Sequence, residues 1–321
     1  MLSPENTPLP ETVQGWLELD KKYRIKGRYD ISQILVKGEG VLVWDADGRA
    51  YIDFESGQVC ASTGHCHPAY TASIVEQAAK LVQTGSRYTN PPRILLARKL
   101  ANIMPGNLSR ECGGHDHPFE AIRPSCKWFA IVHFDVTPDI ITTSKSMGGG
   151  VPLCAVTTTP EIADSVAELG YHQPSSHTDD PFLVAVGLAN MESLERRGLA
   201  QNAEVMGRYL KDEFERMQAN HEILGDIRGF GLTIGLEIVI DRASKAPSPL
   251  HASAISEYCH THGLLLGHRP SGAVSGNGIR ILPPLILTRT EADEGVLILR
   301  DAFVHAEKTV EARGADGTSW M

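Results

Sequence analysis

The hydrophobic pattern alternates between two spacings along the chain. Apolar residues recur at helical spacing over residues 69–81, 93–103, 160–169, 182–196, 201–217, 251–262 and 288–307. Short runs rich in β-branched and aromatic residues lie between them, at 40–44, 50–54, 140–143, 151–156, 226–240, 264–266 and 279–282. This mixture of strands and helices predicts an α/β protein.

Some stretches carry more specific local signals. The strands at 40–44 and 50–54 flank a turn that ends in Asp47-Gly48, which predicts a β-hairpin. Residues 1–30 are predicted to form a lightly structured arm, and 311–321 a disordered tail. Residues 111–124 show neither a helical nor a strand period, although the segments on both sides look like parts of one domain.

Size and charge narrow the classes of function. The chain has 321 residues, 42% of them hydrophobic, which is enough for more than one domain. The net charge is −9 without a basic block, so nucleic acid is not expected as a partner. No apolar run reaches the length of a membrane span, so no membrane partner is expected, and the first residues do not resemble a secretory signal.

Six scattered cysteines without CxxC spacing indicate free thiols in a reducing compartment, so we expect a cytoplasmic protein.

Lys145 stands between the predicted strand Ile140–Thr143 and three glycines, Gly148-Gly149-Gly150. Open α/β sheets bind ligands at the carboxyl ends of their strands. A partly desolvated amine at that place can attack a carbonyl group and form a Schiff base. The alternative is a surface lysine beside a flexible turn, which the local pattern alone favours.

A second candidate stretch is polar and rich in small residues. It follows the hairpin and reads Ser56-Gly57-Gln58, then Gly64-His65-Cys66-His67-Pro68. Its glycines let the backbone approach a ligand. The two histidines could be metal ligands, but a second ligand pair would be needed, and only His115 and His117 are candidates. We therefore rank a metal site here as the lesser interpretation.

Taken together, these motifs identify a family resemblance. The hairpin, the loop at 56–68, the stretch from Val136 to Gly150, and the sequences Gly225-Asp226-Ile227-Arg228-Gly229 and Arg280-Ile281-Leu282-Pro283-Pro284 occur in an order that resembles the class III aminotransferases of pyridoxal-phosphate fold type I. The resemblance covers about residues 35–110 and 127–305. Within the family, the loop at 56–68 is most similar to 2,2-dialkylglycine decarboxylases.

The resemblance implies roles for individual residues. Lys145 matches the lysine that binds pyridoxal phosphate as a Schiff base and moves the substrate's α-proton. Arg280 matches the arginine that holds the substrate carboxylate, and Gln58 a glutamine beside that carboxylate. Ser176 matches a hydroxyl residue, usually threonine, that reaches the cofactor phosphate of the partner subunit, so a homodimer is implied.

A possible alkali-metal site follows from the same resemblance. Its side-chain ligands would be Ser86, Ser176 and Asp180, and their oxygen atoms suit a hard cation such as K⁺ or Na⁺. The alternative for Ser86 and Asp180 is a loop hydroxyl and a helix cap, and the two interpretations are equally supported.

Other family features are missing from the sequence. The family would have a small-residue phosphate loop, an aromatic residue stacked on the pyridine ring, and a strand ending in an aspartate that pairs with the pyridine nitrogen. Between Arg110 and Lys127 the chain has only the aperiodic stretch, and nothing around Asp116 resembles a strand. We interpret this as an internal deletion near residues 110–126, of about 100–150 residues, and a skipped or mis-assigned exon would explain it.

The resemblance predicts the architecture. Residues 1–55 would contribute an arm and hairpin to a small α+β domain, and 198–321 would form the rest of that domain. Residues 56–197 would form a truncated large domain, a mixed sheet with helices on both faces.

The implied reaction is a decarboxylation-dependent transamination of a dialkylglycine-type amino acid, with a keto acid such as pyruvate as amino acceptor. The alternatives are an ordinary class III (ω-)aminotransferase, a catalytically impaired truncated remnant, and a partner that dimerises with a full-length paralogue.

Overall fold

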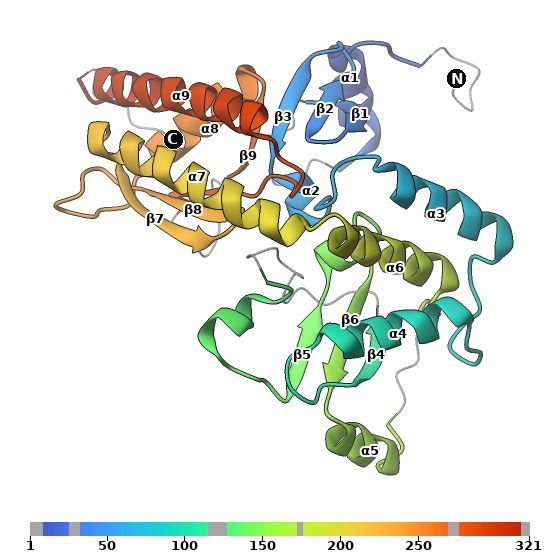
Figure 1. Cartoon of the computed structure of the whole chain (residues 1–321). Helices are drawn as coiled ribbons and strands as arrows, with labels where there is room; N and C mark the ends of the chain where they lie inside the picture. The colour runs from blue at the N-terminus through green and yellow to red at the C-terminus, as the bar shows by residue number, and fades with distance from the viewer. Residues whose placement is uncertain (1–8, 26–32, 115–126, 172–175, 269–275, 316–321) are drawn as a thin grey trace.

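In the computed structural model the described residues are 9–25, 33–114, 127–171, 176–268 and 276–315 (Figure 1). The helices in these parts are α1 (Val13–Tyr23), α2 (Ser56–Val59), α3 (Pro68–Lys80), α4 (Pro91–Ile103), α5 (Pro160–Glu168), α6 (Pro181–Arg196), α7 (Leu199–Asn220), α8 (Pro249–Thr261) and α9 (Arg289–Ala315), with 3-10 turns η1 (Ala130–Phe134) and η2 (Lys145–Met147). The strands are β1 (Leu35–Glu39), β2 (Leu42–Asp45), β3 (Ala50–Phe54), β4 (Arg110–Gly114), β5 (Ile140–Thr143), β6 (Cys154–Thr158), β7 (Leu224–Phe230), β8 (Thr233–Ile238), β9 (Leu264–His268) and β10 (Gly278–Ile281).

A seven-stranded sheet joins the two ends of the sequence. Its strand order is β1-β2-β3-β9-β10-β8-β7. The pairs are antiparallel except β3 and β9, which run parallel with Ile52 opposite Leu264. The predicted hairpin is confirmed as β2 and β3, and its loop is closed by Asp45, whose carboxylate accepts hydrogen bonds from Asp47 N and Arg49 N.

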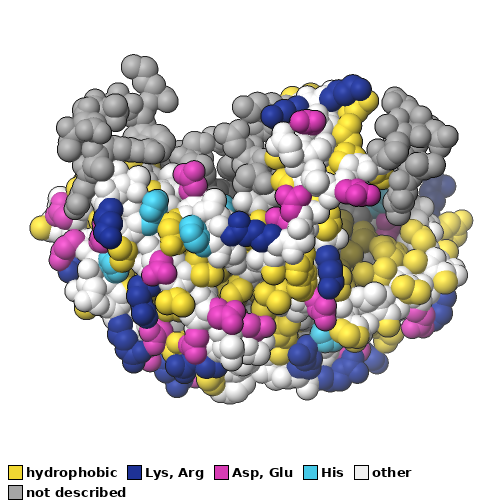
Figure 2. All heavy atoms as spheres, turned by 90° about the horizontal axis from the view of Figure 1, so that it is seen from above, with side chains coloured by type: hydrophobic (Ala, Val, Ile, Leu, Met, Phe, Trp, Pro, Cys, Tyr) yellow, Lys and Arg dark blue, Asp and Glu magenta, His cyan; other side chains and the backbone are white. Residues whose placement is uncertain are grey.

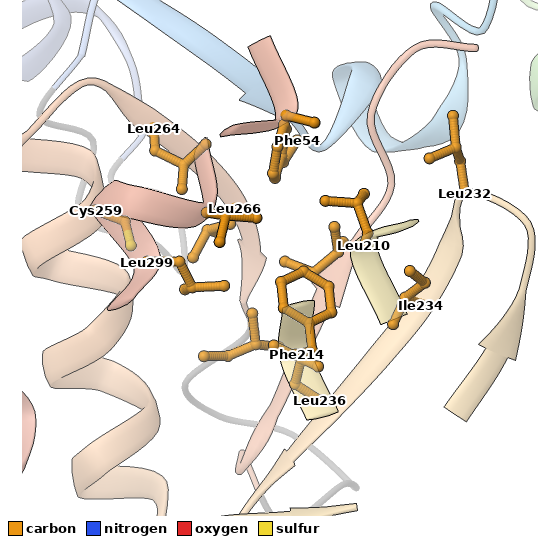
Figure 3. Close-up of a cluster of buried hydrophobic side chains, with 14 of the residues drawn as sticks. Phe54, Leu210, Phe214, Leu232, Ile234, Leu236, Cys259, Leu264, Leu266 and Leu299 are labelled. Atoms are coloured by element: carbon orange, nitrogen blue, oxygen red, sulfur yellow. The ribbon is translucent and has the colours of Figure 1, made fainter. Parts of the chain in front are cut away.

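The larger hydrophobic core lies between this sheet and helices α7, α8 and α9 (Figure 3). On α7 the buried residues follow the helical spacing, and they include Ala203, Met206, Leu210, Phe214 and Met217. They pack against alternate residues of β8, where the pattern of buried and half-buried positions has a period of two. The apolar residues at helical spacing on α7 and those at alternate positions of β8 therefore pack in the same core.

A separate three-stranded antiparallel sheet has the order β4-β6-β5. Ile141 and Ala155 on one of its faces belong to a second core with residues of α4 and α6. On the opposite face Ile140 is 53% exposed and Val156 38%. Strand β5 therefore forms an edge of this short sheet, with apolar side chains exposed on one face.

Several boundaries differ from the sequence predictions. Helix α1 occupies part of the predicted arm, and α9 continues to Ala315, so the predicted disordered tail is wrong for 311–315. Strand β4 covers residues 111–114, which show no strand period because three of its five residues are Cys or Gly. The rest of the aperiodic stretch and His115, Asp116 and His117 lie outside the described residues. Nothing tests the domain boundaries, which stay a prediction.

On the face shown in Figure 2, Lys and Arg are interleaved with Asp and Glu and do not gather into a patch of one sign. Among the described helices, none combines the length and the apolar character that crossing a bilayer requires.

Candidate active site

Lys145 lies two residues after the end of β5, at the carboxyl end of that strand, as predicted. It opens the η2 turn with a φ of 54°, a left-handed conformation that is unfavourable for a residue with a side chain. The side chain is partly buried and close to Cys60. Burial raises the pKa of the Cys60 thiol, and the positive charge of Lys145 opposes that rise.

A second left-handed segment faces this turn. All four residues of α2 have positive φ, namely Ser56 (52°), Gly57 (55°), Gln58 (59°) and Val59 (71°). Backbone hydrogen bonds close the turn, and Cys60 N donates to Ser56 O over 2.9 Å. Such conformations cost free energy and concentrate at functional sites. Gln58, the predicted neighbour of the substrate carboxylate, stands in the middle of this strained turn.

The α2 turn links Lys145 to the strand that carries Arg280. At one end, Ser146 Oγ donates to Val59 O over 2.7 Å, next to the lysine. At the other, Ser56 Oγ donates to Leu282 O, two residues beyond Arg280. The three residues that the resemblance places around the substrate thus lie on segments that are hydrogen-bonded to one another.

Arg280 lies on β10, an inner strand of the seven-stranded sheet, with a glycine beside it on each neighbouring strand. It pairs with Gly235 on β8 and with Gly267 on β9. A Cβ atom at Gly267 would lie 3.4 Å from Arg280 Nε and 3.3 Å from its Cβ. The arginine side chain therefore lies across a strand position that has no side chain of its own.

The glycines after Lys145 allow close packing. Gly149 has a φ of 64°, and a Cβ there would lie 2.6 Å from Asn190 Cγ and 3.0 Å from Tyr70 Cε2. Tyr70 of α3 is partly buried in this packing, and burial raises its pKa to about 12. Neither Tyr70 nor Asn190 is marked by a sequence motif.

The histidines of the 56–68 loop have separate surroundings. His65 Nε2 lies 2.8 Å from Asp53 Oδ2, and the other oxygen of Asp53 accepts hydrogen bonds from Glu55 N and Ser56 N. Burial lowers the pKa of His67, and Arg197 lowers it further. Among the described residues, no group of three or more His, Cys, Asp and Glu side chains could hold a metal ion.

The residues proposed for an alkali-metal site lie in one region. Ser86 and Ser176 line a cavity of about 450 Å³ together with residues 83–85, 87 and 88. Asp180 is buried, and its Oδ2 lies 2.8 Å from His177 Nδ1. Its Oδ1 accepts no hydrogen bond from a described residue. Asp180 also stands at the N-cap of α6, so both sequence interpretations stay open.

Comparison with known sequences identifies the family. The sequence model for "Aminotransferase class-III" matches residues 25–113 and 124–303. The chain belongs to the class III aminotransferase family. The first matched part ends and the second begins within the aperiodic stretch at residues 111–124. Pyridoxal phosphate is the cofactor of this family.

Curated relatives match in two ways. An acetylornithine aminotransferase from Caldanaerobacter subterraneus is 26% identical over 403 aligned positions, which include 88% of this chain and 98% of the relative. Since that alignment is longer than this chain, the relative has segments without a counterpart here. A leucine/methionine racemase from Thermococcus litoralis is 36% identical over 57% of this chain, which spans 40% of the racemase. Human mitochondrial alanine–glyoxylate aminotransferase 2 is 38% identical over 54% of this chain, which spans 34% of that protein.

Solved structures agree with the fold. A transaminase from the marine bacterium Virgibacillus superposes with a TM-score of 0.84 at 18% identity, covering 91% of this chain and 99% of the other. A PMP-bound aminotransferase from Vibrio fluvialis gives a TM-score of 0.82 at 16% identity, covering 90% and 97%. The mixed, mostly antiparallel sheet therefore has the fold of type I pyridoxal-phosphate aminotransferases, as predicted.

The described residues fit the covalent part of a pyridoxal-phosphate site. Lys145 supplies a partly buried amine at a strand end, in a strained turn that neighbouring side chains hold. An acidic partner for the pyridine nitrogen is not found at the carboxyl ends of β4 and β5, where the described residues are glycines on one strand and Thr143 and Ser144 on the other. Ser144 Oγ is buried there without a hydrogen-bond partner among the described residues.

Proposed function

We propose that this protein is a pyridoxal-phosphate-dependent aminotransferase in which Lys145 holds the cofactor covalently. The observation that carries the proposal is the strained α2 turn, hydrogen-bonded both to the residue after Lys145 and to the strand of Arg280. Strain of this kind persists only where the surrounding structure holds it in place. The relatives' names, which include acetylornithine, 4-aminobutyrate and alanine–glyoxylate aminotransferases, support the reaction class.

Each proposed site residue has a chemical task. The amine of Lys145 is the nucleophile and afterwards the base that moves the substrate's α-proton. The guanidinium group of Arg280 holds the substrate carboxylate in two parallel hydrogen bonds, and Gln58 lies beside that carboxylate and helps to orient it. When bound, pyridoxal phosphate supplies the electron sink for breaking a bond at the substrate's Cα.

The choice of the bond to be broken separates two versions of this function. In a dialkylglycine decarboxylase, Gln58 and Arg280 would place the carboxylate bond perpendicular to the cofactor ring, and pyruvate or another keto acid would accept the amino group. In an ordinary (ω-)aminotransferase they would place the C–H bond there. Release of carbon dioxide from 2-aminoisobutyrate supports the first version, and transamination without it supports the second.

The assembly and the cation belong to the proposal as well. We propose a homodimer in which Ser176 serves the cofactor phosphate of the partner subunit, with K⁺ or Na⁺ held near Ser86, Ser176 and Asp180. The shared cavity of the two serines and the unpartnered oxygen of Asp180 support the cation. Activity that is the same in sodium, potassium and tetramethylammonium buffers would argue against it.

The deciding experiment uses the purified chain with pyridoxal phosphate. We expect an absorbance band of the lysine-bound cofactor, and borohydride reduction should attach the cofactor to Lys145, as mass spectrometry of the peptides would show. Lys145→Ala should abolish both signals. Lys99→Ala is the matched control, because Lys99 lies on α4 and pairs with Glu195. A wild-type chain without the band would instead be a non-catalytic remnant.

A further inference from the structure

We propose that Asn190 is a positioning residue for Lys145: its carboxamide holds the backbone of the lysine turn and thereby directs the lysine amine toward the site. This inference deepens the proposed function and rests on it for the role of Lys145. Asn190 lies on α6, far from Lys145 in the sequence, and is completely buried.

All polar groups of the Asn190 side chain are used. Its Nδ2 donates to Ser146 O over 2.6 Å and to Met147 O over 3.3 Å, the two residues that follow Lys145. Its Oδ1 accepts a hydrogen bond from Thr63 Oγ1 over 3.0 Å. One carboxamide therefore joins the lysine turn to the loop at 56–68.

These hydrogen bonds act on a backbone that would otherwise relax. Lys145 has the left-handed φ of 54°, which residues with a side chain avoid unless their surroundings impose it. Asn190 holds the carbonyl groups of the two residues that follow Lys145. Ser146 Oγ joins the same turn to Val59 O. If the carboxamide is lost, the turn can return to a right-handed conformation, which redirects the Lys145 side chain.

The position is unusual for a purely structural residue. Its neighbours Val186, Met191 and Leu194 on α6 are buried and apolar, and a leucine or methionine would continue that pattern. A buried amide is tolerated only when its hydrogen bonds are satisfied. The hydrogen bonds of the Asn190 side chain all go to the lysine turn and to Thr63. The lysine turn and Thr63 therefore explain the asparagine at this position, whereas the packing of the helix alone does not.

The test needs a readout of where the Lys145 amine lies, independent of the cofactor. Cys60 provides it, since the charge of Lys145 lowers the thiol pKa against the effect of burial. The rate of Cys60 alkylation by iodoacetamide, followed by peptide mass spectrometry at a fixed pH below the thiol pKa, reports the thiolate fraction. We expect Asn190→Leu to slow this alkylation about threefold or more, a conservative value for one charge nearby at an effective dielectric constant of about 20.

A double-mutant cycle distinguishes positioning from loss of stability. Lys145→Met should slow Cys60 alkylation as much as Asn190→Leu, and Asn190→Leu should add nothing in the Lys145→Met background. Thr63→Val should reproduce part of the effect, and Thr63→Ser should restore it. Leu194→Ala, on the same helix but away from the turn, should lower the denaturation midpoint without slowing the alkylation.

A second measurement separates this inference from the proposed function. If Lys145 binds pyridoxal phosphate, Asn190→Leu should weaken that binding about tenfold, or about 1.4 kcal/mol, while Leu194→Ala leaves it unchanged. A wild-type chain that binds no cofactor would refute the proposed function, but the Cys60 cycle would still test Asn190. Equal alkylation of Cys60 in the wild type and Asn190→Leu would refute the positioning role.

Discussion

Glu111 provides the sharpest test of the electrostatics of the truncated sheet. It lies on β4, on the face that packs toward α4 and α6, opposite Thr157 of β6. Its pKa is raised to about 7, mainly by burial and also by the nearby Asp179 carboxylate, while Arg93 opposes the rise. Arg93 itself pairs with Asp179 over 2.9 Å, which limits how much it can compensate Glu111.

The sign of the effect follows from the two pKa values. In the unfolded chain a glutamate has its ordinary pKa of 4.5, and in the folded chain the value is about 7. The folded state therefore binds the proton more tightly, so the contribution to stability is complete below pH 4.5 and is lost as the pH rises through 7. The full difference corresponds to about 3 kcal/mol. Because the side chain keeps some solvent contact, we expect about 1–2 kcal/mol.

Glu111→Gln removes this titration. Urea denaturation between pH 5 and pH 8 should show little difference from the wild type at pH 5 and a more stable variant at pH 8. Glu76→Gln is the control, since Lys80 lowers the pKa of this exposed carboxylate, which stays ionised over the whole range. Parallel stability curves for Glu111→Gln and the wild type would show that Glu111 is not buried beside Asp179 as described.

Three further substitutions test the packing. Gly207→Ala would place a Cβ 2.2 Å from the Gly231 carbonyl, and this overlap should outweigh a gain of about 1 kcal/mol in helix propensity. The variant should therefore be less stable, and a higher denaturation midpoint would contradict this prediction. Phe214→Ala should cost about 3–5 kcal/mol in urea denaturation, and a loss below about 1 kcal/mol would mean that the core is open there. Gly267→Val should crowd Arg280 and weaken binding of a carboxylate substrate about tenfold in calorimetry, with little change in melting temperature. An unchanged affinity would show that Arg280 does not bind the substrate carboxylate.

Most helices and the hairpin can be predicted from the sequence because neighbouring residues determine where they begin and turn. Helix α4 begins where Asn90 caps Arg93 N and a proline follows, and α5 begins in the same way at Thr159 and Pro160. The hairpin follows from its turn residues. The order of strands in the sheet has no such local cause. The parallel pairing of Ile52 with Leu264 joins segments more than 200 residues apart.

The residues of the candidate site also differ in whether the sequence marks them. The place of Lys145 between a strand and glycines makes it a candidate, although the local pattern alone favours a surface lysine. The family resemblance assigns its role, together with those of Gln58 and Arg280. Asn190 cannot be found in this way, because its partners are backbone carbonyl groups on another element. The strain at Ser56–Val59 is equally hidden, since nothing in the residue types other than Gly57 favours positive φ.

The hydrogen-bond network and the short sheet together suggest how much of a site this chain retains. The lysine turn is hydrogen-bonded to α2 through Ser146 and to α6 through Asn190. It also contacts the short sheet, because Thr143 Oγ1 of β5 lies 3.3 Å from Met147 Sδ and 3.4 Å from Ala155 O of β6. The lysine turn is therefore held both by α2 and α6 and by the short sheet, in which β5 is an edge strand. Covalent capture of a carbonyl compound can survive in such a chain, whereas the acid that would activate the pyridine ring has no strand among the described residues to carry it. We thus expect cofactor attachment at Lys145 to be easier to demonstrate than turnover.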